Sequence, residues 1–196
     1  MNRFIRLISL AIMLCLALSF AACTSEGSGD ASVASEASKV EYTVGTIENN
    51  YYVNEWADIK FRLVTPWKAC AKSDYAVYES ATTDCGLLAG DATRGQQLAI
   101  VFEENPSKLI DEKKYLDNFV QGLKSTAPDF ICGEYFTKTI AGKEFLGVRS
   151  VYARGRVSVY QFEYVRLHDG KFISIIVTAS DENTAIKAVE SFTSAN

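Results

Sequence analysis

The stretch EYFTKTIAGKEFLGVRSVYARGRVSVYQFEYVRLHDGKFISIIVTA, residues 134–179, decides the fold. Its apolar and aromatic residues recur at every second position, in runs separated by short turn signals at Ala141-Gly142, Arg154-Gly155 and His168-Asp169-Gly170. A period of two is typical of β-strands, and an Asp-Gly step between two such runs favours a tight hairpin. The stretch therefore predicts a meander of three or four antiparallel strands.

Two segments beside the meander have the periodicity of amphipathic helices. Residues 111–125 place five apolar side chains on one stripe, namely Tyr115, Leu116, Phe119, Val120 and Leu123. Acidic residues begin this segment and Pro128 follows it, as is typical of helix ends. Residues 181–194 close the chain with a second apolar stripe, made of Ala185, Ile186, Val189 and Phe192. These patterns favour an α+β domain in which an antiparallel sheet is flanked by helices.

The segment before the first helix is less regular. Strands are expected at residues 51–54, 59–63 and 97–103. Residues 73–81 are compatible with a helix, and a loop is expected after it because glycines recur at Gly86, Gly90 and Gly95.

The N-terminus is typical of an export signal. Arg3 and Arg6 precede a 14-residue apolar run, and Ala21 and Ala22 supply the small residues that a signal peptidase requires before its cut. The run is too short to span a bilayer comfortably, since a helix needs ~20 apolar residues. Residues 1–22 are therefore predicted to be a signal peptide, and Cys23 would become the new N-terminus.

The four residues Phe20-Ala21-Ala22-Cys23 resemble the bacterial lipobox. The resemblance implies that the sulfur of Cys23 carries a diacylglyceryl group, and two acyl chains make a lasting membrane anchor. The alternative is ordinary cleavage after Ala22, which would leave Cys23 unmodified. Residues 24–39 are small and polar with no aromatic side chain, so residues 23–39 are expected to form the lipidated cysteine and a flexible tether.

Residues 40–196 remain as the folded part, and their length suits a single domain. The whole chain has 20 basic and 24 acidic residues; without Arg3 and Arg6 the balance is 18 against 24, a net charge of −6. Nucleic-acid binding requires clustered basic residues, so no nucleic-acid partner is expected.

Three stretches of the predicted domain resemble PsbP-like and DcrB-like domains. They are YYVNEWADIKFRLVTPW (residues 51–67), TIAGKEF (139–145) and DGKFISIIV (169–177). The resemblance covers about residues 50–193 and implies an α/β/α sandwich, a PsbP-like fold. It also implies an accessory role in binding or assembly, and similar lipid-anchored domains occur in Gram-positive bacteria.

Residues that could carry chemistry are few. The single histidine, His168, precedes Asp169-Gly170, where a turn residue is expected rather than a base. Four acidic residues could converge between a strand end and a helix start, although a solvated loop and a helix cap are favoured: Glu103, Glu104, Asp111 and Glu112. Tyr160, Phe162 and Tyr164 share one strand face, which we interpret as packing rather than as a ligand groove. We expect no metal site and no cofactor.

The cysteines of the predicted domain are Cys70, Cys85 and Cys132. An exported protein can keep disulfides, and three thiols always leave one unpaired. Cys70 and Cys85 lie in the irregular segment after Trp67, so we expect a bond between them, with Cys132 free. Such a bond would contribute about 3 kcal/mol in the chain-entropy model. The alternative is that all three are reduced and packed as small apolar residues.

Together these observations predict a lipid-anchored protein on the extracytoplasmic face of the cell membrane. We expect a non-enzymatic accessory domain that binds another envelope protein. The alternative is a small-ligand-binding module with a pocket between the sheet and a helix.

Overall fold

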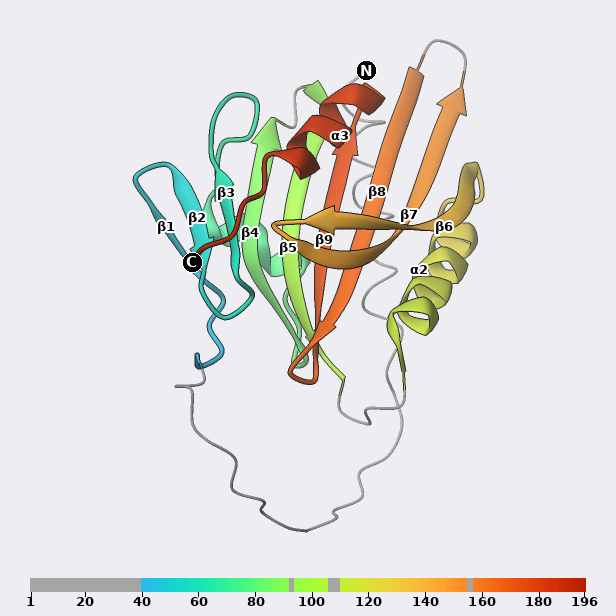
Figure 1. The fold of residues 1–196 in the computed structure, drawn as a ribbon. Coiled ribbons are helices and arrows are strands. Elements are labelled where there is room, and N and C mark those ends of the chain that lie inside the picture. The colour runs from blue at the N-terminus through green and yellow to red at the C-terminus, as the bar shows by residue number, and fades with distance from the viewer. Residues whose placement is uncertain (1–39, 92–93, 106–109, 155–156) are drawn as a thin grey trace.

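The computed structural model describes residues 40–91, 94–105, 110–154 and 157–196. The predicted signal peptide and tether, with Cys23, lie outside these residues. The described residues form a central antiparallel sheet of six strands and a smaller sheet of three (Figure 1). In order across the central sheet, the strands are β4 (Thr83–Asp91), β5 (Gln96–Glu104), β9 (Lys171–Ala179), β8 (Val157–His168), β7 (Lys143–Arg154) and β6 (Phe130–Ile140).

The strands β6 to β9 are the predicted meander, and each pairs with the next in sequence. The turn between β6 and β7 has positive φ at Ala141 and Gly142, and the turn between β8 and β9 has positive φ at Asp169 and Gly170. Such backbone suits the right-handed twist of the strands that it joins. Both hairpin predictions are confirmed, whereas Gly155 of the third predicted turn lies outside the described residues.

The small sheet contains β1 (Thr46–Glu48), β2 (Tyr51–Asn54) and β3 (Ile59–Arg62). It lies beside the central sheet in Figure 1 and shares an apolar core with it, to which Tyr52, Ile59 and Phe61 contribute. The C-terminal residues return to this sheet, because Lys60 exchanges two backbone hydrogen bonds with Thr193. The C-terminal residues are therefore hydrogen-bonded to strand β3 of the small sheet.

Each face of the central sheet is covered by a different set of elements. On one face lie the small sheet and α3 (Glu182–Glu190). Figure 1 shows α3 in front of the central strands. On the other face lie α2 (Glu112–Thr126), whose buried Leu116 and Leu123 pack with Val148 and Val165, and the 3-10 helix η2 (Lys72–Val77). We call this second face the α2 face. Helices thus lie on both faces, as predicted.

Three boundaries differ from the sequence expectations. The expected helix at 73–81 is the shorter η2, and the expected helix at 181–194 ends at Glu190. The expected loop around Gly86 and Gly90 is wrong, because both residues lie in strand β4. A side chain at Gly86 would come within 2.5 Å of the Tyr52 hydroxyl, and one at Gly90 within 2.2 Å of the Gln96 carbonyl. Both glycines serve close packing.

The two edges of the central sheet are also different. At the β4 edge, the segment before η2 forms a bridge between Ala69 and Ala89, and the Cys70 amide donates to the Leu88 carbonyl. At the β6 edge, the register with β7 shifts between Cys132 and Tyr135, which inserts one extra residue as a β-bulge.

Candidate functional site

A group of polar side chains lies buried on the α2 face, in the middle of the central sheet. Gln161 and Glu163 of β8 are fully buried, and Ser174 of β9 and Glu103 of β5 are 1% and 4% exposed. Gln161 and Glu163 are two positions apart on one strand, so both side chains lie on the same face, about 7 Å apart along the strand. We call Glu103, Gln161, Glu163 and Ser174 the carboxyl cluster.

Two hydrogen bonds hold the carboxyl groups. The Ser174 hydroxyl donates to Oε1 of Glu163 at 2.5 Å, and the Tyr115 hydroxyl donates to Oε2 of Glu103 at 3.2 Å. Tyr115 belongs to the first turns of α2, so the helix covers the Glu103 end of the cluster. Each carboxyl group is thus oriented by a hydroxyl from a neighbouring element.

Other polar atoms of the cluster are buried without a partner. Neither amide atom of Gln161 has a hydrogen-bond partner in the structure, and neither does Oε2 of Glu163. A buried polar atom without a partner costs about 1–3 kcal/mol, so native proteins keep few of them. Two alternate positions on β8 therefore carry three buried polar atoms without a hydrogen-bond partner.

Burial changes the acidity of the cluster. Burial, with a smaller contribution from the nearby Glu103, raises the pKa of Glu163 to about 8, although the Ser174 hydrogen bond lowers it. Burial likewise raises the pKa of Glu103 to about 7, against the effect of the Tyr115 hydrogen bond. Within the described part of the chain, no basic side chain forms an ion pair with either carboxyl group. At neutral pH, Glu163 is mostly protonated and can donate a hydrogen bond.

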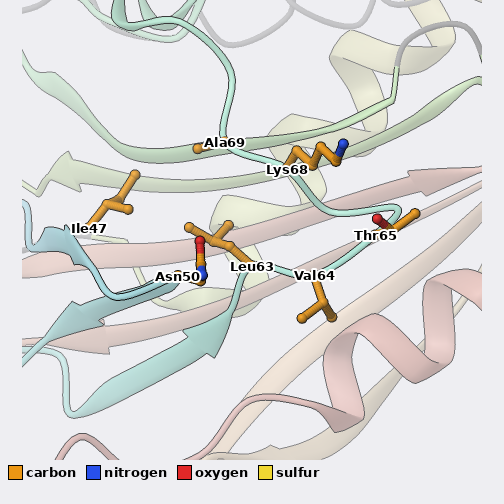
Figure 2. Close-up of a pocket in the computed structure, with 7 residues that line it drawn as sticks. All are labelled: Ile47, Asn50, Leu63, Val64, Thr65, Lys68 and Ala69. Carbon is orange, nitrogen blue, oxygen red and sulfur yellow. The ribbon is translucent and has the colours of Figure 1, made fainter.

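A second feature is a surface groove of about 740 Å³ between the small sheet and the segment that precedes η2 (Figure 2). Its lining residues are Ile47, Asn50, Leu63, Val64, Thr65, Lys68 and Ala69. Ile47 and Val64 are exposed apolar residues, and Lys68 is the cation in the lining. The groove offers an apolar surface with a few hydrogen-bonding groups and no paired titratable groups. This chemistry suits a contact with another molecule rather than catalysis.

Comparison with known proteins identifies the fold. No protein-family model and no curated protein matches the chain. The solution structure of cyanobacterial PsbP (CyanoP) from Synechocystis sp. PCC 6803 matches with a TM-score of 0.51 and 14% identity, over 79% of this chain and 97% of that one. The fold is PsbP-like. LpqN, involved in cell envelope biogenesis of Mycobacterium tuberculosis, gives a TM-score of 0.43 and 18% identity over 69% and 82% of the two chains. Because this TM-score is lower, the assignment of the fold depends on the PsbP comparison alone.

The PsbP-like fold separates the four acidic residues that the sequence singled out. Glu104 forms an exposed ion pair with Lys171, Asp111 caps α2 by accepting from the Lys114 amide, and Glu112 accepts from the Leu167 amide. For these three residues, the interpretation as a solvated loop and a helix cap, rather than as a converging acidic site, is confirmed. For Glu103 the expectation of a solvated position is wrong, because its side chain points into the carboxyl cluster under α2.

His168 ends β8 next to the Asp169-Gly170 turn, as predicted. One of its ring nitrogens lies 3.0 Å from the Trp56 carbonyl oxygen, and the two rings pack 4.7 Å apart. Burial, with the charge of Arg166, lowers the pKa of His168. The histidine thus ties β8 to the loop between β2 and β3 and has a structural role.

The aromatic residues of β8 pack in the core, as interpreted. Phe162 and Tyr164 are buried on the face of the central sheet that carries α3, with their rings stacked 6.0 Å apart, and Phe136 contacts both edge-on. Tyr160 is half-buried beside them, with the Arg149 guanidinium over its ring.

The three cysteines have free thiols in the structure, so the predicted bond between Cys70 and Cys85 is not formed there. The Cys85 thiol instead donates to the Leu87 carbonyl at the bulge of β4, and Cys132 lies 3.4 Å from the Ser150 hydroxyl. Cys70 and Cys85 nevertheless belong to one apolar cluster beneath η2. Their pairing stays a prediction.

Across all the residues that the structure describes, no group of three or more histidine, cysteine or acidic side chains could hold a metal ion. Among the same residues, no helix is long and apolar enough to cross a membrane.

The sequence analysis does not single out Gln161, Glu163 and Ser174. The signal that could have found two of them is their position. Gln161 and Glu163 alternate with core aromatic residues on a central strand of a sheet that is predicted to be covered on both faces.

Proposed function

We propose that this protein is a lipid-anchored, extracytoplasmic accessory domain that binds another protein of the cell envelope and catalyses no reaction. The observation that carries the proposal is the lipobox-like Phe20-Ala21-Ala22-Cys23, placed after an apolar run and before a polar tether. A lipid on Cys23 would hold the domain ~20 Å or more from the membrane surface on this tether.

The folded part has features that suit a binding role. Its groove exposes Ile47 and Val64 next to the hydrogen-bonding groups of Asn50, Thr65 and Lys68 (Figure 2). Partly apolar patches rimmed by polar groups are typical of protein contacts. The single histidine is engaged with Trp56, which argues against a Ser-His-Asp type of active site. The groove is therefore the surface that we assign to the partner protein.

The anchor is tested by substitution of the cysteine. Cys23→Ala should move the protein from the detergent phase to the aqueous phase in a detergent-partitioning assay, because the residue that carries the acyl chains is lost. Cys15→Ala is the matched control, because Cys15 lies inside the apolar run, and it should leave partitioning unchanged. Continued detergent partitioning of Cys23→Ala would contradict the lipoprotein proposal.

The partner surface is tested by crosslinking in intact cells. Val64→Glu places a charge in the groove and should abolish the crosslinked species that the wild type forms with an envelope protein. Val77→Glu is the matched control, because Val77 is 43% exposed, close to the 44% of Val64, but lies on η2 outside the groove. An equal loss with both variants, or no loss with Val64→Glu, would remove the groove from the proposal.

The alternative function, a small-ligand-binding module, is favoured by a different observation. The carboxyl cluster lies between the central sheet and α2, the place where the sequence analysis put a ligand pocket. Its unpartnered polar atoms are the feature that a ligand would explain.

A further inference from the structure

The structure assigns the carboxyl cluster to the binding of a small organic cation: we propose that a primary ammonium group inserts between Glu163, Gln161 and Glu103 on the α2 face. This site is independent of the lipid anchor and of the groove. It adds a ligand of defined charge to a domain proposed above to bind a protein.

The first argument is charge. Glu103 and Glu163 are two acidic side chains in the interior of one sheet face, and neither has an ion pair with a basic residue in the described ranges. A buried carboxyl group without a counter-charge is kept neutral by a proton. A cation supplied from outside can replace that proton as the compensating charge. The chain itself offers hydroxyl groups here, from Ser174 and Tyr115, and these supply hydrogen bonds without charge.

The second argument is the set of unpartnered atoms. Oε1 of Gln161 is a buried acceptor with no donor in the structure, and Oε2 of Glu163, which also has no partner, becomes a second acceptor once the carboxyl group loses its proton; both lie on the same face of β8. An ammonium group has three N–H donors and no acceptor. Two of these donors match the two free oxygens, and the third is left for the Glu103 side of the cluster. A neutral alcohol, with one donor, could satisfy only one of them.

The third argument is the aromatic cover. Tyr115 contacts the cluster from α2 through its hydroxyl, and Tyr78, the residue that follows η2, lies within electrostatic range of Glu163. Both are buried, and burial is the main reason that the pKa of each is raised; Glu103 and Glu163 raise the pKa of Tyr115 further, and Cys85 and Glu163 raise that of Tyr78. Aromatic side chains beside acidic groups supply an apolar contact for the alkyl part of an organic cation. Acidic groups together with tyrosine rings favour an alkylammonium ion over a bare metal ion, for which the donor set is too small.

Binding is expected to displace protons. The titratable groups that face Glu163 are Glu103 on β5, Tyr115 on α2 and Tyr78 beside η2. Near pH 7 the Glu163 carboxyl is mostly neutral, so an entering ammonium ion converts it to the carboxylate and its proton passes to the buffer. No bond to carbon or nitrogen changes, and the ammonium ion keeps its own protons. Binding should therefore release up to one proton per ligand and strengthen as pH rises.

Isothermal titration of the purified protein with n-butylammonium chloride tests the proposal. With a pKa of about 8 for Glu163, the ionised fraction rises from ~1% at pH 6 to ~90% at pH 9, so affinity should be at least tenfold higher at pH 9. At pH 7, titrations in buffers with different ionisation enthalpies should reveal proton release. Absence of binding at pH 9, or equal binding of n-butanol, overturns the proposal.

Three variants locate the site. Glu163→Gln keeps the size of the side chain and should weaken butylammonium binding at least tenfold at pH 9 and reduce the proton release at pH 7 to the part that comes from Glu103. Gln161→Leu should weaken binding and keep the proton release. Glu104→Gln is the matched control, because Glu104 neighbours Glu103 in β5 but forms an exposed ion pair with Lys171. If Glu163→Gln binds butylammonium as tightly as the wild type does, the proposal is overturned. If a variant does not fold, the proton release measured on the wild-type protein decides the question.

Discussion

Stability that falls as pH rises is the prediction that depends most directly on the carboxyl cluster. Burial raises the pKa of Glu163 from an ordinary value of 4.5 to about 8 in the folded protein. Between these two values the folded state holds a proton that the unfolded state has lost, so raising the pH favours unfolding. This difference corresponds to about 5 kcal/mol of unfolding free energy, at about 1.4 kcal/mol per pH unit. Glu103, with a pKa of about 7, acts in the same direction.

The measurement is urea unfolding of residues 39–196 at pH values from 5 to 8.5. The wild type should lose several kcal/mol over this range, whereas Glu163→Gln should keep only the smaller loss caused by Glu103, because glutamine does not titrate. His168 acts in the opposite direction, since its lowered pKa favours the folded state as pH rises through the pKa of the unfolded state. That effect is common to both proteins and cancels in their difference.

The control for this prediction is Glu104→Gln, which removes an exposed carboxylate and should leave the pH slope of the wild type unchanged. The reasoning is refuted if wild-type stability rises steadily from pH 5 to pH 8.5. It is also refuted if wild type and Glu163→Gln have the same slope, because Glu163 would then be ionised in the folded protein.

Further predictions concern the packing, the domain boundary and the cysteines. Leu116→Ala, at a fully buried position under α2, should lower the free energy of unfolding by about 2–5 kcal/mol in urea titrations, and a loss under 1 kcal/mol would contradict the burial. Residues 39–196 alone should melt in one cooperative transition, because the predicted tether supplies no apolar contacts, and a broad transition would mean that the boundary is misplaced. Non-reducing peptide mapping of the exported protein should find Cys70 linked to Cys85 and Cys132 free; a linked Cys132 peptide, or three alkylatable thiols, would exclude this pairing.

The meander and its helices could be predicted because local sequence determines them. Turn residues such as Asp169-Gly170 fix the hairpins, and the apolar stripe of residues 111–125 fixes the buried side of α2. Strand β4 could not be predicted in this way. Its glycines are typical of loops, and the reason for Gly86 is the Tyr52 side chain, which is distant in sequence and close only in the folded protein.

The carboxyl cluster could not be predicted from the sequence, for a similar reason. Gln161 and Glu163 have the spacing of solvent-facing residues on a half-buried strand, and only the position of β8 inside a sheet covered on both faces makes them buried. Glu103 is one of the four acidic residues that the sequence singles out, but its partner Tyr115 belongs to the predicted apolar stripe of the helix. Contacts between segments far apart in the sequence decide which polar residues become buried.

The bulge in β6 has a consequence for how these domains behave at high concentration. β6 is the last strand of the central sheet, and its exposed edge includes Ile131, which is 74% exposed. A straight apolar edge would offer a second molecule a template for continuous strand pairing. The extra residue between Cys132 and Tyr135 breaks that repeat. Deletion of Gly133 is expected to straighten the strand and to let two molecules pair through their β6 edges, while the segment before η2 still covers the β4 edge.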